Sequence, residues 1–155
     1  MATFKITPAD TATPRFVAIT HLSDAAEYGF AARILYESQH KRIASPQYLV
    51  ISQAIELYLK AFIVIRSGSP DVVQGPRIRH NLQGLLAMAE KFGFAGCSQE
   101  ARDLIAALQP LHKTHYFRYR NMTRDPWPSV RVAVATLDGF AKAISPVISK
   151  AINSR

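Results

Sequence analysis

The sequence predicts an all-α protein, an up-and-down bundle of four main helices with one additional short helix. Residues 54–65, AIELYLKAFIVI, are apolar on almost every side, which is typical of a helix at the centre of a bundle. Other segments repeat apolar residues at helical spacing, and no segment alternates cleanly with a period of two. Helices with apolar stripes bury them against one another, so a helical bundle is the expected architecture.

The N-terminal half is predicted to hold an arm and two helices. Residues 1–20, with prolines at positions 8 and 14, are expected to form an irregular arm on a single helical domain that spans residues 21–155. The first helix is predicted at 24–39, where a D-x-x-E pattern marks its start. The second is predicted at 45–66, with a serine cap, a proline in the first turn and SGSP after its end.

The C-terminal half is predicted to hold three helices. One covers 81–93, from an asparagine cap to a glycine stop. A shorter one follows Ser98 and ends before Pro110, and residues 111–128 are interpreted as a long connection that has room for one helical turn. The last covers 129–152, and Pro146 is expected to kink or interrupt it.

The composition fits one globular domain. The chain has 155 residues, of which 48% are hydrophobic and 19% charged, and this excludes wholesale disorder. A single cysteine, Cys97, excludes an intramolecular disulfide and suits a cytoplasmic protein. No membrane segment is expected, because the longest uncharged apolar stretch, 61–65, is far shorter than the roughly 20 residues of a span. The formal charge of +8 permits binding to nucleic acid, nucleotides or acidic partners.

Glu56 and Lys60 lie four residues apart in the most apolar helix, so partial burial is expected. The simplest interpretation is an ordinary i,i+4 ion pair. The functional alternative is a buried ionic group completed by Arg118 or Arg120. A structural network is favoured over a catalytic one.

His80 and Asn81 begin the third predicted helix, and capping by Asn81 explains the pair adequately. The alternative is that His80 acts as an acid or base beside Arg77 and Arg79. Those two cations would disfavour its charged form.

Residues 111–120, LHKTHYFRYR, mix histidines, cations and aromatics, a pattern that can stack bases and hold phosphates. The alternative is that the aromatic side chains pack in the core or at a dimer interface. His112 and His115 could contribute to a metal site, but no cysteine or carboxylate lies at useful spacing, so no metal is expected. No phosphate-binding glycine loop or G-x-S-x-G motif is present, and no cofactor is expected.

Three ordered segments resemble the HEPN family of small helical-bundle domains: ELYLKA at 56–61, HNLQGLL at 80–86 and HYFRYR at 115–120. The resemblance covers about residues 24–150. It implies a bundle of four or five helices, often a symmetric dimer with the functional groove at the dimer seam. Many members are ribonucleases of defence or toxin–antitoxin systems. Others are non-catalytic binding modules, some partnered with small nucleotidyltransferases.

Active members of that family carry an arginine and, after four to six residues, a histidine near the last helices. In this chain no histidine follows any arginine from residue 118 onward. The resemblance therefore favours a non-catalytic member over a nuclease.

Three hypotheses follow. The favoured one is a non-catalytic, dimeric HEPN-like domain that binds a nucleotide, RNA or an acidic protein partner. The second is a metal-independent ribonuclease with His115 or His112 as general base and Arg118 stabilising the phosphate charge. The third is an interaction subunit of a nucleotidyltransferase partner. The residues predicted to bind are Glu56, Lys60, Arg77, Arg79, His80, Arg118, Tyr119 and Arg120.

Overall fold

The regular structure of the described chain is entirely helical. A computed structural model describes residues 13–38, 44–115 and 128–154. Within these ranges it contains the α-helices α2 (Pro14–Ser38), α3 (Ala44–Ser67), α4 (Leu82–Lys91), α5 (Gln99–Lys113) and α6 (Val130–Asn153), and the short 3-10 helix η1 (Pro70–Val73). The predicted all-α class is confirmed for this part of the chain.

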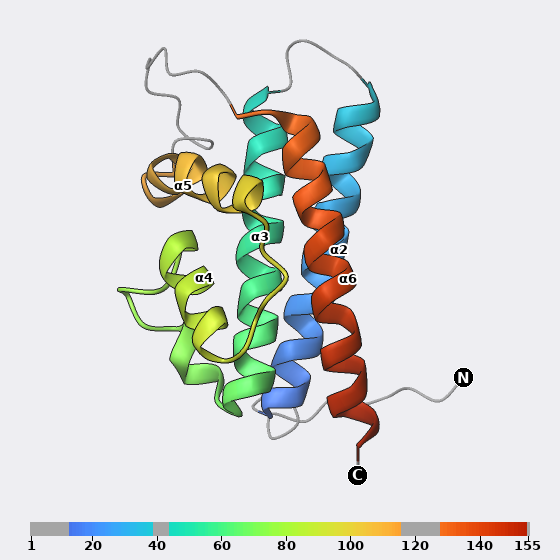
Figure 1. Ribbon diagram of the computed structural model, residues 1–155, viewed down its shortest axis with the longest axis vertical. Helices are drawn as coiled ribbons and strands as arrows, with labels where there is room; N and C mark the ends of the chain where they lie inside the picture. The colour runs from blue at the N-terminus through green and yellow to red at the C-terminus, as the bar shows by residue number, and fades with distance from the viewer. Residues whose placement is uncertain (1–12, 39–43, 116–127, 155) are drawn as a thin grey trace, which may run out of the picture.

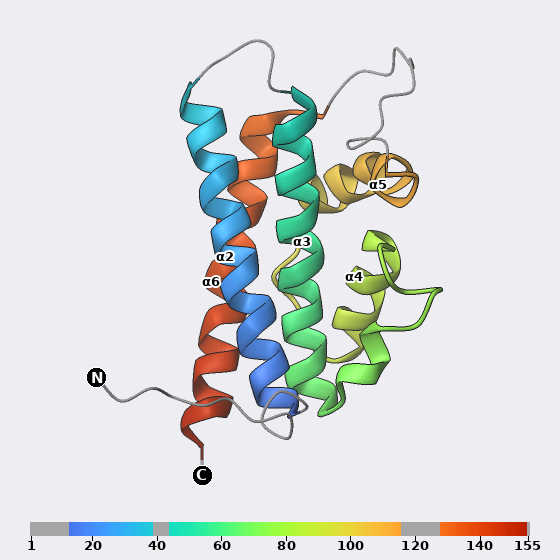
Figure 2. The same cartoon turned by 180° about the vertical axis from the view of Figure 1, so that it is seen from behind.

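Three long helices, α2, α3 and α6, run side by side and form the body of the molecule (Figure 1). The shorter helices α4 and α5 pack against α3 on the side away from α2, and α5 lies across the direction of the long helices (Figure 2). Helix α3 is therefore the one element that contacts all the other helices.

The side chains of α3 confirm its predicted place at the centre of the fold. Ile51, Ile55, Leu59 and Ile63 are all fully buried. Their spacing of four residues gives one continuous apolar stripe along the helix. Edge-to-face aromatic contacts then link α3 to the rest of the core, from Phe62 to Phe94 and from Phe94 to Phe140 on α6.

The first helix begins ten residues earlier than predicted, so the expected irregular arm is wrong for residues 14–20. Helix α2 starts at Pro14, where a proline needs no hydrogen-bond partner for its missing N–H. The Oγ1 of Thr13 accepts a hydrogen bond from the backbone N–H of Phe16 at 3.2 Å, which caps the helix. Ala18 is fully buried against the core. The rest of the predicted arm, residues 1–12, lies outside the described residues.

Helix α5 continues through Pro110, where the sequence predicted its end. The helix reaches Lys113, and the backbone N–H of Thr114 still bonds to the carbonyl of Pro110 at 3.3 Å. A proline removes one backbone bond from a helix without preventing the following turn. Residues 111–113 are therefore helical, and this places His112 on the buried face of α5. Helix α6 likewise continues through Pro146 without interruption.

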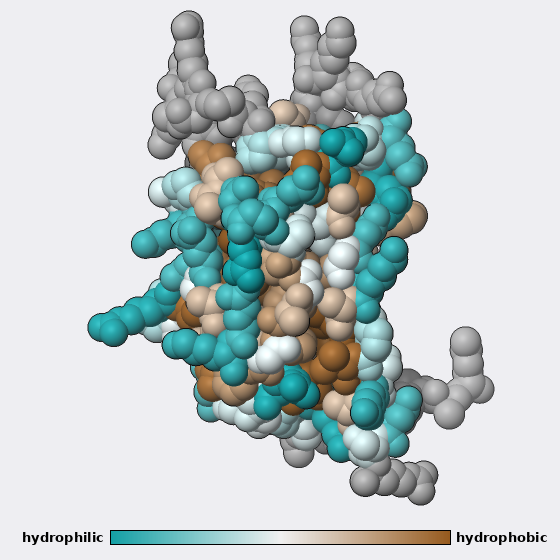
Figure 3. All heavy atoms as spheres, in the orientation of Figure 1, coloured by the Kyte–Doolittle hydropathy of each residue, from teal (hydrophilic) through white to brown (hydrophobic). Residues whose placement is uncertain are grey.

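Helices α3 and α6 are long and apolar enough to cross a membrane by length and composition, which alone is weak evidence. In α3, 72% of the apolar window is buried inside the fold, so packing accounts for its composition. In α6 the share is 39%. Figure 3 shows apolar residues gathered along the middle of the face over α6, with hydrophilic residues on both sides. The expectation that no segment spans a membrane stays a prediction.

Candidate functional site

A carboxylate lies inside the fold at the middle of α3. Glu56 is 3% exposed and Lys60, one turn later, is 8% exposed, so the predicted partial burial of both is confirmed. The Nζ of Lys60 donates to Oε1 of Glu56 at 2.5 Å. This i,i+4 pair is predicted by the sequence, but its burial means that the second carboxylate oxygen also needs partners.

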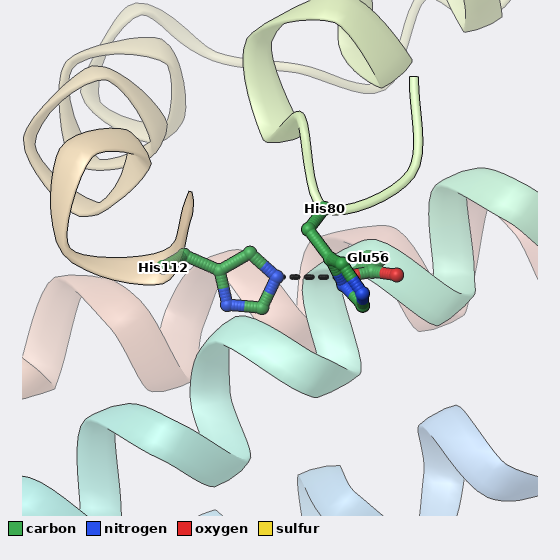
Figure 4. A group of neighbouring side chains, drawn as sticks. All are labelled: Glu56, His80 and His112. Carbon is green, nitrogen blue, oxygen red and sulfur yellow. Dashed lines mark hydrogen bonds and ion pairs between the residues drawn. The ribbon is translucent and has the colours of Figure 1, made fainter. Parts of the chain in front are cut away.

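Two histidines from other parts of the chain reach that second oxygen. The Nδ1 of His80, in the turn before α4, lies 3.1 Å from Oε2 of Glu56. The Nε2 of His112, in the last turn of α5, lies 2.5 Å from the same oxygen. Both rings converge on Glu56 from different elements (Figure 4). His80 and His112, which follow Glu56 by 24 and 56 positions in the sequence, thus form one polar cluster with it.

Glu56 is ionised in this cluster. Burial alone would raise the pKa of its carboxyl, but hydrogen bonds from His112 and Lys60, the charge of Lys60 and the hydrogen bond from His80 hold that pKa well below its ordinary value. An ionised carboxylate can only accept hydrogen bonds. The geometry therefore assigns a proton to Nδ1 of His80 and to Nε2 of His112, because these are the nitrogens that face the carboxylate.

The backbone adopts an unusual conformation at His80 and at His115. Their φ angles are 63° and 55°, and among the described residues they are the only non-glycine residues with positive φ. Such a conformation costs a side-chain-bearing residue about 1–2 kcal/mol and is concentrated at functional sites. Asn81 links this turn to α4, because its Oδ1 accepts a hydrogen bond from the N–H of Gly84 at 2.9 Å and its Nδ2 donates to the carbonyl of Arg77 at 3.2 Å.

The histidine rings form a row that leads from the buried carboxylate to the surface. The ring of His80 makes edge-to-face contacts with His112, at 5.8 Å between centroids, and with His115, at 5.4 Å. The side chain of His112 is 3% exposed, that of His80 is 31% exposed, and His115 is exposed. His80 is thus the member of the Glu56 cluster that a ligand in solution can reach.

A fourth histidine, His21 on α2, lies within electrostatic reach of the cluster. Burial lowers the pKa of His21, and the positive charge of Lys60 lowers it further, while Asp24 and Glu56 act in the opposite direction. Of the five histidines of the chain, His80 and His112 therefore contact the carboxylate, His115 packs on the ring of His80, and His21 is affected by the charge of Glu56.

The structure brings together some of the residues that the sequence singled out. Glu56, Lys60 and His80 meet directly. Arg77 and Arg79 are exposed in the loop that leads to His80. Arg118, Tyr119 and Arg120 lie outside the described residues, so the pairing of Glu56 with Arg118 or Arg120 stays a prediction.

The bond between His112 and Glu56 was not predicted. No carboxylate lies near His112 along the chain, and the one that it contacts comes from α3. The reason for not expecting a metal therefore does not hold. One signal was present, because His112 continues the buried stripe of α5, formed by Ala101, Leu104, Ile105 and Leu108.

A scan against protein-family models and searches of curated proteins and of solved structures found no match to this chain. The HEPN resemblance therefore depends on the three sequence segments alone. Two of them, ELYLKA and HNLQGLL, meet at the contact between Glu56 and His80. The third begins at His115 and otherwise lies outside the described residues.

The buried carboxylate predicts an acid-sensitive fold. The folded pKa of Glu56 is depressed, so its contribution is complete above the unfolded value of about 4.5 and is lost as the pH falls below it. We expect the free energy of unfolding, measured by urea denaturation in chelator-treated buffer, to fall between about pH 5 and pH 3. Glu56→Gln should lack this part of the acid dependence. Equal pH slopes in the two proteins would contradict the assignment.

Proposed function

We propose that this protein is a non-catalytic HEPN-like domain that binds the phosphate groups of RNA or of a nucleotide at the surface around His80. The observation that carries the proposal is the hydrogen bond between His80 and Glu56. It fixes a partly exposed imidazole at the end of a loop that contains two arginines. The up-and-down four-helix arrangement, the homodimer and the cytoplasmic location belong to the same proposal.

The chemistry of this surface suits a phosphate. Glu56 engages Nδ1 of His80, which leaves Nε2 as the nitrogen that can reach a ligand, and Nε2 donates to a phosphate oxygen when both ring nitrogens carry a proton. Arg77 and Arg79 precede it in an exposed loop, and Lys113 and His115 are exposed at the end of α5. Arginine binds phosphate through a planar fork of donors, and the formal charge of +8 attracts polyanions from a distance.

The burial of His112 leaves fewer candidate general bases for the ribonuclease alternative. Of the two histidines predicted as general base, His112 is 3% exposed and its Nε2 is bonded to Glu56. Only His115 is exposed enough to reach RNA. No arginine–histidine motif occurs near the last helices, where active family members carry it, and this argues in the same direction, so we favour binding without cleavage. The third hypothesis, an interaction subunit of a nucleotidyltransferase, uses the same basic surface for an acidic protein.

Binding to single-stranded RNA tests the proposal. We expect fluorescence anisotropy in chelator-treated buffer to show an affinity that falls steeply with salt, because each neutralised phosphate releases a counterion. The double variant Arg77→Glu, Arg79→Glu should bind at least ~10-fold more weakly. The matched control Lys142→Glu, Lys150→Glu changes the net charge equally on α6, where both lysines are exposed, and should lose much less.

Three results would count against this proposal. Affinity that is flat with salt would exclude phosphate contacts, and an equal loss in the control would exclude a local site. Cleavage of the RNA that His115→Ala abolishes would favour the ribonuclease alternative.

The proposed homodimer has a candidate surface on α2. Ile19, Phe30 and Ile34 are 41%, 66% and 49% exposed. At 100° per residue the three lie on one face of the helix, so they form an apolar stripe on the outside of the fold. We expect Phe30→Glu to convert a dimer into a monomer in light-scattering measurements. The control Tyr36→Glu alters an exposed aromatic residue about 120° away and should leave the mass unchanged. A monomeric wild type would contradict the dimer.

A further inference from the structure

We propose that Glu56, His80 and His112 form a binding site for Zn²⁺. One carboxylate oxygen and two imidazole nitrogens, each from a different element of the fold, lie within 4.8 Å of one another. All three side chains point to a common centre (Figure 4). The inference is independent of the phosphate-binding proposal, because the metal would use Nδ1 of His80, which faces Glu56, whereas a phosphate would bind the other ring nitrogen, Nε2.

The set of donor atoms selects the metal. Two histidines and one glutamate are a known zinc ligand set, with a fourth position for water or another ligand. Mg²⁺ and Ca²⁺ prefer ligand sets made of oxygen alone, so two imidazoles disfavour both. Zn²⁺ has no electronic preference for one geometry, and this suits a site whose ligands come from α3, α5 and a turn.

The distances are close to those that a bound ion needs. Zinc bonds of about 2.0–2.2 Å in a tetrahedron place ligand atoms ~3.3 Å apart. Oε2 of Glu56 lies 3.1 Å from Nδ1 of His80, which already fits. The same oxygen lies 2.5 Å from Nε2 of His112, so this pair must separate by less than ~1 Å. On binding, the nitrogen of each ring that faces the metal gives up its proton, because imidazole binds a metal through a nitrogen lone pair.

The surroundings of the site provide both an entrance and an orienting contact. Glu56 and His112 are buried, whereas the side chain of His80 is 31% exposed and gives the ion a way in. The Nζ of Lys60 bonds to Oε1, the other carboxylate oxygen, and so orients Oε2 toward the histidines. The charge of Lys60 opposes a bound cation, so we expect weaker binding than at a four-ligand structural zinc site.

Metal titration of the tag-free protein, residues 1–155, tests this assignment. We expect calorimetry to show one Zn²⁺ per chain and Co²⁺ to give the visible absorption of a bound, low-symmetry ion, while Mg²⁺ shows no binding. His80→Ala should lower the Zn²⁺ affinity at least ~10-fold. This variant is chosen because His80 is partly exposed, and circular dichroism checks that it folds. Glu56→Gln should show the same loss.

The matched control is His115→Ala, which removes a neighbouring histidine that is not a proposed ligand. It should retain the wild-type affinity for Zn²⁺. The assignment is overturned if a folded His80→Ala binds as tightly as the wild type, if His115→Ala loses binding equally, or if the wild type binds no Zn²⁺. None of these results bears on RNA binding measured with chelator, so the two proposals can fail separately.

Discussion

Replacing Glu56 by leucine is expected to lower the free energy of unfolding by about 3–5 kcal/mol. Glu56 is 3% exposed and is the shared acceptor for Lys60, His80 and His112. Its removal leaves a buried ammonium without its counter-charge and a buried imidazole N–H without an acceptor. Urea denaturation measures the loss directly.

The control for this substitution is the double variant Glu56→Leu, Lys60→Met. It removes both charges and keeps two apolar side chains of similar size, so part of the lost stability should return. A change below about 1 kcal/mol in Glu56→Leu alone, or no recovery in the double variant, would contradict the buried network.

Replacing Leu59 by alanine should destabilise the protein by about 2–5 kcal/mol. Leu59 is fully buried in α3, the helix against which all the others pack. The substitution removes apolar contacts and leaves a cavity that the surrounding helices can only partly close. Thermal or urea denaturation checks the expected loss.

Ser52 offers a matched control on the same helix. It is fully buried too, and within the described part of the chain its Oγ has no hydrogen-bond partner. Ser52→Ala removes that unsatisfied hydroxyl, so it should leave stability unchanged or raise it. A loss of several kcal/mol in Ser52→Ala, or none in Leu59→Ala, would contradict the described packing of α3.

Much of the fold could be predicted from periodicity and capping. The apolar run of α3, the Asn81 cap of α4 and the start of α5 after Ser98 were predicted from local signals, and the structure confirms each of them. The early start of α2 and the length of α5 were missed because Pro14 and Pro110 were interpreted as breakers. Pro14 begins a helix, a position where proline is well tolerated, and at Pro110 the buried packing of Leu108 and His112 on either side outweighs the local cost.

The candidate site was only half predictable. Glu56 and Lys60 stand out because two charges occupy an otherwise apolar helix, and His80 stands out because it precedes a cap. The bond from His112 to Glu56 spans 56 residues and depends on how α5 crosses α3, which no local pattern encodes. A buried histidine in the stripe of α5 indicated a need for a partner but did not identify it.

Nitrogen-15 NMR of the imidazole rings shows whether Glu56 accepts hydrogen bonds from both His80 and His112. In metal-free buffer we expect a proton on Nε2 of His112 and on Nδ1 of His80, both protected from rapid exchange with water. Both signals should change in Glu56→Gln. If the two rings exchange freely with water and are insensitive to Glu56→Gln, the buried network does not exist.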